Sequence, residues 1–426
     1  MATQFSVQDN KPWKATFFTI WSGQALSILG SQLVQFALIW YLTVQTGSAT
    51  VLATASLVGM LPNVVLGPFI GTLVDRWNRR RIMLIADSIV ALATIALAVL
   101  FALDVVEVWH IYAVLFIRSL AGAFHANAMN ASTSLMVPVE HLTRIQGFNQ
   151  MLEGGLNVVA APLGALLLGM LPMQGILSID VITALFAILP LAFIHQPERN
   201  AVAAEKTTVW TDFKAGLGYM FSWPGLLIIG LMTVGINFTI IPAFSLLPLM
   251  IRDYFGGSAI HLSWVESAMG AGMIIGGALL GIWGGFSRKI LTSLIGLMGM
   301  GAGTLILALA PSSAIFLAVG GALLVGLMTP ITMGPFFAVI QSTVEPDMQA
   351  RIFSLLSSVG TGIAPLGLMI AGPVADRVGI QAWFLLGGIL CIFMAATSLF
   401  IPAVMNMEKK GNPLPEAVGT SVKQAI

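Results

Sequence analysis

Three ionisable residues stand within long apolar stretches of the sequence, where a charged side chain requires a chemical reason. Arg118 lies about nine residues inside one stretch, His125 follows it on the same helical face, and Glu153 lies about eight residues inside the next stretch. A charge at the centre of a lipid bilayer costs roughly 2.5 kcal/mol or more, so it needs a partner or a water-filled cavity. Counted along a helix, His125 and Glu153 have similar depths.

These three residues suggest proton chemistry. We expect Glu153 to take up and release a proton, with Arg118 and His125 setting its proton affinity. A static buried ion pair that only fixes helix packing is the alternative. Three further acids are expected to be less embedded: Asp87 as a cap or a partner of nearby arginines, Asp180 at the start of a helix, and Glu266 near an interface, as a second proton-site candidate.

The composition identifies the elements that position these residues. Of 426 residues, 57% are hydrophobic and only 9% are charged, and the mean hydropathy is +0.93. A soluble domain carries about 25% charged residues, so we predict an all-α integral membrane protein. Twelve apolar runs of transmembrane length are expected, at 15–42, 50–74, 82–103, 109–136, 145–168, 175–195, 225–251, 260–284, 290–309, 313–340, 350–372 and 380–404. The single cysteine, Cys391, excludes a disulfide framework and a thiolate metal site.

The positive charges predict the orientation. With the N-terminus inside, all Lys and Arg residues except Arg118, Arg252 and Arg377 fall on the cytoplasmic side. We therefore expect a multi-pass protein of the cytoplasmic (inner) cell membrane with both termini in the cytoplasm.

A parallel repeat predicts two matched halves, because Ala161-Pro162-Leu163-Gly164 recurs as Ala364-Pro365-Leu366-Gly367. We expect two pseudo-symmetric six-helix bundles, with a substrate path between them near the middle of the bilayer. Pro162 and Pro365 should bend their helices. The expected regions are a cytoplasmic N-terminus (1–14), an N-terminal bundle (15–195), a cytoplasmic linker with an amphipathic helix (196–224), a C-terminal bundle (225–404) and a cytoplasmic tail (405–426).

A charged hinge between two apolar runs carries a family resemblance. The segment from Gly71 to Arg81 resembles the loop signature of the major facilitator superfamily, glycine-x-x-x-aspartate-arginine-x-glycine-arginine-arginine. Asn78 replaces the second glycine and is expected to keep a left-handed turn. Segments such as Thr19–Ala25, Val114–Ser119 and Trp383–Leu386 resemble the macrolide-efflux branch of the drug:proton antiporter-3 group.

The resemblance implies a secondary active efflux transporter that exchanges protons for macrolide-like amphipathic compounds by alternating access. It implies no enzyme activity, no cofactor or metal, and no nucleic acid or nucleotide partner. No G-x-x-x-x-G-K-[ST] loop appears in the sequence. The lipid bilayer, protons and a small amphipathic molecule are the expected partners of a monomer. Export of a siderophore or a lysolipid, or a non-transporting membrane receptor with the same fold, remain as alternatives.

The resemblance also implies site residues. Asp75 should contact the N-terminus of the eleventh span near Ala350–Ser354 when the cytoplasmic side is shut, and Arg79 should pair with Glu140. The expected conformational motif is Gly71, Asp75, Arg76, Arg79, Arg80 and Glu140. The expected substrate cavity is Gln24, Ser27, Ser31, Gln35, Asn237, Phe244, Met328, Thr332, Met333 and Phe336. Charges that only fix topology, and small polar residues that only pack helices, are the alternatives.

Overall fold

A computed structural model describes residues 13–193 and 209–408 of this chain. Over these two ranges the regular secondary structure is helical and contains no strand. The helices are α1 (Trp13–Thr46), α2 (Ala49–Arg76), α3 (Arg79–Ala102), α4 (Val108–Met136), α5 (Val139–Met170), α6 (Met173–Phe193), α7 (Val209–Ser222), α8 (Pro224–Ser245), α9 (Leu247–Leu249), the π-helical turn η1 (Met250–Tyr254), α10 (Ala259–Trp283), α11 (Lys289–Leu309), α12 (Ile315–Thr343), α13 (Pro346–Val378), α14 (Ile380–Leu399) and α15 (Pro402–Met405).

Twelve of these helices are long and apolar enough to cross a membrane. They coincide with the twelve predicted spans, so the predicted all-α membrane fold is confirmed. Large apolar side chains on these helices remain exposed, as with Ile282 at 88% and Phe193 at 79%. Such extensive apolar surface is suited to lipid rather than to water. Gly284 ends α10 in the left-handed conformation (φ 73°), which a glycine adopts without steric cost.

Helix α7 occupies the position predicted for an amphipathic helix, and it packs against α13 and α8. Residues 194–208 of the predicted linker lie outside the described residues. The location of α7 along a membrane surface stays a prediction.

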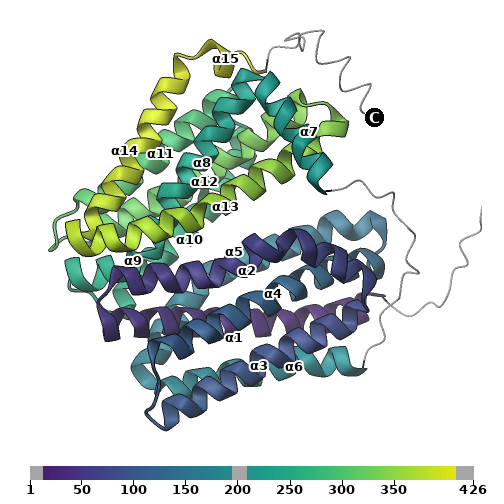
Figure 1. Ribbon diagram of the computed structural model, residues 1–426, viewed down its shortest axis with the longest axis vertical. Helices are drawn as coiled ribbons and strands as arrows, with labels where there is room; N and C mark the ends of the chain where they lie inside the picture. The colour runs from purple at the N-terminus through teal and green to yellow at the C-terminus, as the bar shows by residue number, and fades with distance from the viewer. Residues whose placement is uncertain (1–12, 194–208, 409–426) are drawn as a thin grey trace, which may run out of the picture. The chain divides into compact units, whose positions relative to one another are not determined.

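The chain forms two compact units: unit 1 holds residues 1–35, 65–153 and 171–203, and unit 2 holds the rest. These units differ from the two predicted halves, because 36–64 and 154–170 belong to unit 2. In unit 1, α3 lies beside α4 and α6 (Figure 1). Helix α1 approaches α6 closely, since a Cβ on Gly23 would lie 2.3 Å from the carbonyl oxygen of Phe186.

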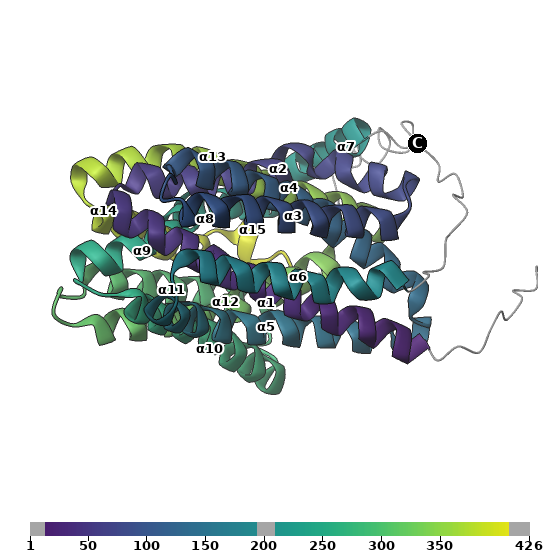
Figure 2. The same ribbon diagram turned by 90° about the horizontal axis from the view of Figure 1, so that it is seen from below.

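In unit 2, α11 lies beside α12 and also packs against α14, while α10 packs against α12 (Figure 2). The glycines of α10 permit this packing. A Cβ on Gly276 would lie 2.0 Å from the carbonyl oxygen of Leu327, so the two backbones are nearly in contact. Helix α8 packs against α13 and α14 and completes the wall of a cavity.

Candidate functional site

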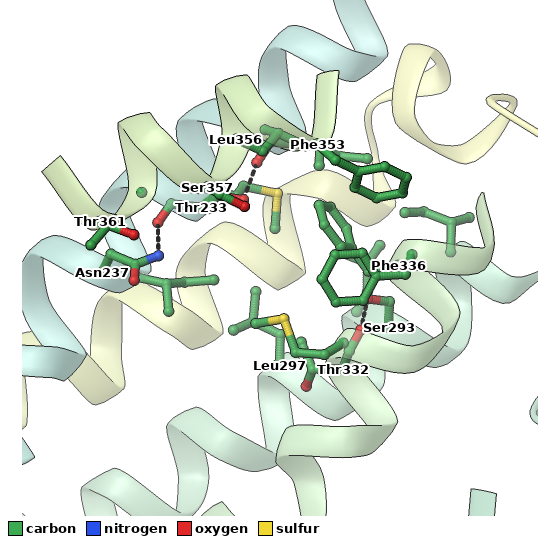
Figure 3. A pocket seen from close by; sticks show the side chains of 18 residues that line it. Thr233, Asn237, Ser293, Leu297, Thr332, Phe336, Phe353, Leu356, Ser357 and Thr361 are labelled. Carbon is green, nitrogen blue, oxygen red and sulfur yellow. Dashed lines mark hydrogen bonds between the residues drawn. The ribbon is translucent and has the colours of Figure 1, made fainter. Parts of the chain in front are cut away.

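A cavity of about 270 Å³ lies within unit 2 among α8, α11, α12 and α13 (Figure 3). Its lining is Ile229, Met232, Thr233, Ile236, Asn237, Ile290, Ser293, Leu294, Leu297, Thr332, Met333, Phe336, Phe337, Phe353, Leu356, Ser357, Gly360 and Thr361. None of these side chains is ionisable, so the cavity offers hydrogen bonds and apolar surface but no counter-charge.

One end of the cavity is polar. Figure 3 shows Asn237 and Thr361 there, with Thr233 and Ser357 near them. The Asn237 amide nitrogen donates to the carbonyl oxygen of Thr233 at 2.8 Å. Within the described part of the chain, the Asn237 side-chain oxygen and the hydroxyls of Ser357 and Thr361 form no hydrogen bond. These groups are therefore available to a bound molecule.

The other end of the cavity is aromatic. The Phe336 ring lies 5.5 Å from that of Phe337, which lies 5.6 Å from that of Phe353. Met232 and Met333 add polarisable side chains that adapt to ligands of varied shape. The Ser293 hydroxyl donates to the carbonyl oxygen of Thr332 at 2.5 Å. This hydrogen bond joins α11 to α12 and leaves the Ser293 hydroxyl proton unavailable to a ligand.

Four of the predicted cavity residues line this cavity: Asn237, Thr332, Met333 and Phe336. The other two predicted in this half do not. The Phe244 ring packs against Phe384 at 5.9 Å, and Met328 packs over Gly299. The family resemblance indicated the helices α8 and α12 that line this cavity, but not the rotation that turns each side chain toward it.

Unit 1 contains a buried ionic cluster, which we call the Arg118 layer (Ser31, Thr94, Arg118 and Asp180). Arg118 Nη1 lies 2.5 Å from Asp180 Oδ2 and 2.8 Å from Thr94 Oγ1, while Nη2 donates to the carbonyl oxygen of Ser31 at 3.2 Å. The hydroxyls of Thr94 and Ser31 donate to the two Asp180 oxygens, each at 3.1 Å. The side chains of Arg118 and Asp180 are only 9% and 2% exposed, so this charge pair is shielded.

A second cluster, the His125 layer (Gln24, Asp87 and His125), is less complete. Gln24 Nε2 donates to Asp87 Oδ2 at 3.2 Å. His125 Nε2 lies 3.5 Å from Asp87 Oδ1 without forming a hydrogen bond, and this nitrogen is buried with no hydrogen-bond partner within the described residues.

The two layers repeat along the same three helices at an interval of seven residues. The matched positions are Gln24 and Ser31 in α1, Asp87 and Thr94 in α3, and His125 and Arg118 in α4. Seven residues are about two helical turns, or roughly 10.5 Å, so each helix presents both polar residues on one face. The Arg118 layer also contains Asp180 of α6, and the His125 layer as defined here has no residue from α6.

The structure does not bring Glu153 to the other two predicted proton-coupling residues. Glu153 is exposed, whereas Arg118 faces Asp180 and His125 faces Asp87. The expectation for Asp180 at the start of a helix is wrong, because it is two turns inside α6 and buried. Similar depth along two helices does not imply contact, since contact also requires the helices to be neighbours with facing sides. The seven-residue interval of polar residues was the signal available in the sequence.

On α1, the predicted polar face is divided between these layers. Gln24 and Ser31 hydrogen-bond to buried acids of unit 1. Ser27 is half-buried and Gln35 is exposed, and neither forms a hydrogen bond with the described residues. A substrate-binding role for this face stays a prediction.

Comparison with known proteins establishes the family. The model of the Major Facilitator Superfamily matches residues 20–367 and 227–422. The chain belongs to the major facilitator superfamily. It is 37% identical to Macrolide efflux protein A of Streptococcus pyogenes over 399 residues, which cover 93% of this chain and 98% of that protein. The resemblance to the macrolide-efflux branch is thereby confirmed.

More distant relatives agree with this family assignment. The chain is 25% identical to the Multidrug efflux pump Tap of Mycolicibacterium fortuitum, over 90% of this chain and 95% of that protein. Among solved structures, a single-site mutant of the nucleoside transporter NupG aligns with a TM-score of 0.67 at 14% identity, covering 91% of this chain and 100% of that chain. This last likeness concerns the fold alone.

The hinge signature of the superfamily is only partly visible in the described residues. Gly71, Asp75 and Arg76 fall within α2 and Glu140 within α5, but their side chains lie outside the described residues. The predicted contacts of Asp75 with α13 and of Arg79 with Glu140 therefore stay predictions.

The structure describes the side chains of two neighbouring hinge residues, Arg80 and Asn78. Arg80 donates from Nε to the carbonyl oxygen of Leu191 at 2.5 Å and from Nη2 to that of Ala192. The expectation for Asn78 is wrong: its φ of −67° is not left-handed. Instead its side chain accepts from the Arg81 backbone N–H at 3.0 Å and caps α3, a role that asparagine performs well.

An acid that the sequence analysis missed joins α13 to α2 within unit 2. The Asp376 carboxylate accepts from the backbone N–H groups of Ala49 and Thr50 at 2.7 and 3.0 Å, and from the hydroxyls of Thr50 and Ser48 at 2.6 and 3.2 Å. It therefore caps the N-terminus of α2, where an anion is favoured. The helices approach closely here, since a Cβ on Gly372 would lie 2.8 Å from the Thr50 Cα.

The two superfamily prolines lie inside continuous helices, Pro162 in α5 and Pro365 in α13. Each removes one backbone N–H from the helical ladder. Their predicted role in bending stays a prediction.

Proposed function

We propose that this protein is a secondary active exporter that moves macrolide-like amphipathic compounds out of the cell in exchange for protons, by alternating access. The observation that carries the proposal is the uncharged cavity of unit 2, polar at one end and aromatic at the other, set among helices of membrane length. The similarity to Macrolide efflux protein A over nearly the whole of both chains supports it.

The cavity chemistry supports an amphipathic substrate. Its aromatic and methionine surface suits a large apolar face, while the free oxygen of Asn237 and the hydroxyls of Ser357 and Thr361 suit hydroxyl groups on that molecule. A macrolactone ring bears both kinds of surface. Because the lining offers no ionisable group, any charged substituent of the substrate is expected to lie outside this cavity.

Proton exchange is the proposed energy source. One proton crossing a potential of 100 mV supplies about 2.3 kcal/mol. The ionisable groups buried in unit 1 provide a place for a proton within the transmembrane helices. Glu153 stays a proposed participant, as an exposed acid on α5. We also propose that the protein acts as a monomer in the cytoplasmic membrane with both termini in the cytoplasm.

The test is macrolide accumulation in a bacterial host stripped of its own pumps. Cells that express the protein should accumulate less labelled erythromycin than cells with the empty vector, and a protonophore should abolish the difference. The same cells should show raised resistance to macrolides in a susceptibility panel. Equal accumulation with and without the protein would refute macrolide export. Reduced accumulation that survives the protonophore would refute proton drive.

A pair of matched variants tests whether the substrate uses this cavity. Gly360 faces the cavity, and a Cβ there would lie 3.3 Å from both Asn237 and Thr233. Gly360→Leu should remove export, whereas Gly362→Leu, at a position where a Cβ meets nothing within 4 Å, should keep it. Equal export by both variants would show that the substrate does not use this cavity.

A further inference from the structure

The two polar layers of unit 1 differ in their capacity to hold a proton. In the Arg118 layer, the guanidinium is permanently charged, and the Asp180 carboxylate accepts hydrogen bonds from Arg118, Thr94 and Ser31. A proton on Asp180 would leave the buried guanidinium without its counter-charge. The layer therefore keeps one positive and one negative charge, and its net charge stays zero.

The His125 layer has an unused bonding position. Asp87 Oδ2 accepts from Gln24, whereas Oδ1 accepts no side-chain hydrogen bond from the described residues and lies 3.5 Å from His125 Nε2. With neutral His125 and ionised Asp87 the layer carries one negative charge. One added proton makes the layer neutral, and when it resides on His125 both ring nitrogens carry an N–H, so that Nε2 is a donor toward Oδ1.

The side chains of this layer are slightly more exposed than those of the other layer. The side chains of His125 and Asp87 are 15% and 11% exposed, against 9% and 2% for Arg118 and Asp180. Along the helices of this layer, the charged groups nearest in sequence are Arg80 and Arg81, seven and six residues before Asp87 in α3, and Arg118, seven residues before His125 in α4. The other charged or titratable residues on the described helices of unit 1 are Lys14, Asp75, Arg76, Arg79, His110, Tyr112, Glu140, His141, Arg144, Glu153 and Asp180.

We propose that the His125 layer is the site at which this protein takes up and releases its transported proton, while the Arg118 layer holds α1, α3, α4 and α6 together. This inference rests on the proposed proton exchange. The proton passes from water to the His125–Asp87 pair, forming one N–H or O–H bond, and later returns to water on the other side. Because the layer changes between one negative charge and none, each protonation state favours a different packing of α1, α3 and α4.

The test uses the full chain in sealed lipid vesicles with labelled erythromycin as the probe. One assay measures uptake driven by an imposed pH gradient, and the other measures exchange of labelled for unlabelled erythromycin without a gradient. In Asp87→Asn, protonation of His125 would leave an uncompensated positive charge, so gradient-driven uptake should fall to that of protein-free vesicles while exchange persists. In His125→Gln the proton must reside on Asp87 alone, so the pH of half-maximal transport should shift.

A matched control is Asp104→Asn, in the turn after α3. Asp104 has a positive φ of 56°, which asparagine also adopts, and it is exposed. This variant should behave as the wild type in both assays. If Asp87→Asn does not insert, the pH profile of His125→Gln decides the question.

The outcomes separate the inference from the proposed function. Gradient-driven uptake by Asp87→Asn, or an unchanged pH profile in His125→Gln, would overturn the inference. Loss of the pH response in Glu153→Gln or Glu266→Gln, with Asp87→Asn unaffected, would also overturn it and assign the proton to another acid. If the wild type exchanges erythromycin but ignores the pH gradient, proton antiport itself fails. If the wild type moves no erythromycin, the proposed substrate class fails.

Discussion

Substitution of Asp180 by asparagine should destabilise the protein strongly, and the structure predicts by how much. The side chain is only 2% exposed and opposes an Arg118 side chain that is 9% exposed. Asparagine has nearly the same shape but no charge, so the guanidinium would remain buried without a counter-charge. Removal of one partner from a buried ion pair costs about 3–5 kcal/mol. Because a folded domain has a total stability of about 5–15 kcal/mol, this loss is large.

A double substitution distinguishes the charge effect from a packing effect. In Asp180→Asn with Arg118→Met, both charges are absent, and the asparagine oxygen can still accept from the Ser31 hydroxyl that now bonds Asp180. Replacement of a whole buried pair by uncharged residues is often nearly neutral. We expect the double variant to be more stable than Asp180→Asn alone, so that the effects of the two substitutions are strongly non-additive.

The assay is reversible unfolding of the purified full-length protein in mixed micelles, with increasing SDS and helical content followed by circular dichroism. The free energies of the wild type, the two single variants and the double variant complete a double-mutant cycle. A loss below about 1 kcal/mol in Asp180→Asn would match an exposed ion pair and refute the burial argument. Additive effects of the two substitutions would equally contradict a direct Arg118–Asp180 pair.

Three further predictions concern unit 2. Asp376→Ala removes the carboxylate that caps α2 and should cost about 0.5–2 kcal/mol in the same unfolding assay; an unchanged stability would show that the cap is not maintained in the purified protein. Asn237→Ala and Phe336→Ala should each reduce macrolide export while the protein still reaches the membrane, measured as resistance relative to expression level; full resistance in both would exclude the cavity as the substrate site. Gly276→Val should disrupt the contact of α10 with α12, because a Cβ there would lie 2.0 Å from a backbone oxygen, whereas Gly277→Val meets open space and should be tolerated; equal thermal stability of the two variants would contradict the packing.

The fold was predictable from the sequence because a membrane-spanning helix is a local property. About 20 consecutive apolar residues must form a helix in lipid, wherever the neighbouring helices lie. Each predicted span therefore has its counterpart, from α1 (Trp13–Thr46) to α14 (Ile380–Leu399).

The candidate site was only partly predictable. Asn237 and Phe336 line the cavity as expected, because both lie on the helices that the family resemblance placed there. Asp180 was missed as a partner of Arg118, because the predicted span put it too near a helix end. The role of Asp376 was also missed, because its partners are backbone N–H groups at the start of a helix more than 300 residues earlier in the chain.

The sequence by itself determined the membrane class, the number and order of the helices and the superfamily, all of which depend on residues close together in the chain. Only the tertiary structure decided which buried acid meets which base. That pairing depends on which helices are neighbours and how each is rotated about its axis, and many weak packing contacts distributed along the whole chain fix both properties together. In this way the tertiary structure places Arg118 opposite Asp180 and His125 opposite Asp87.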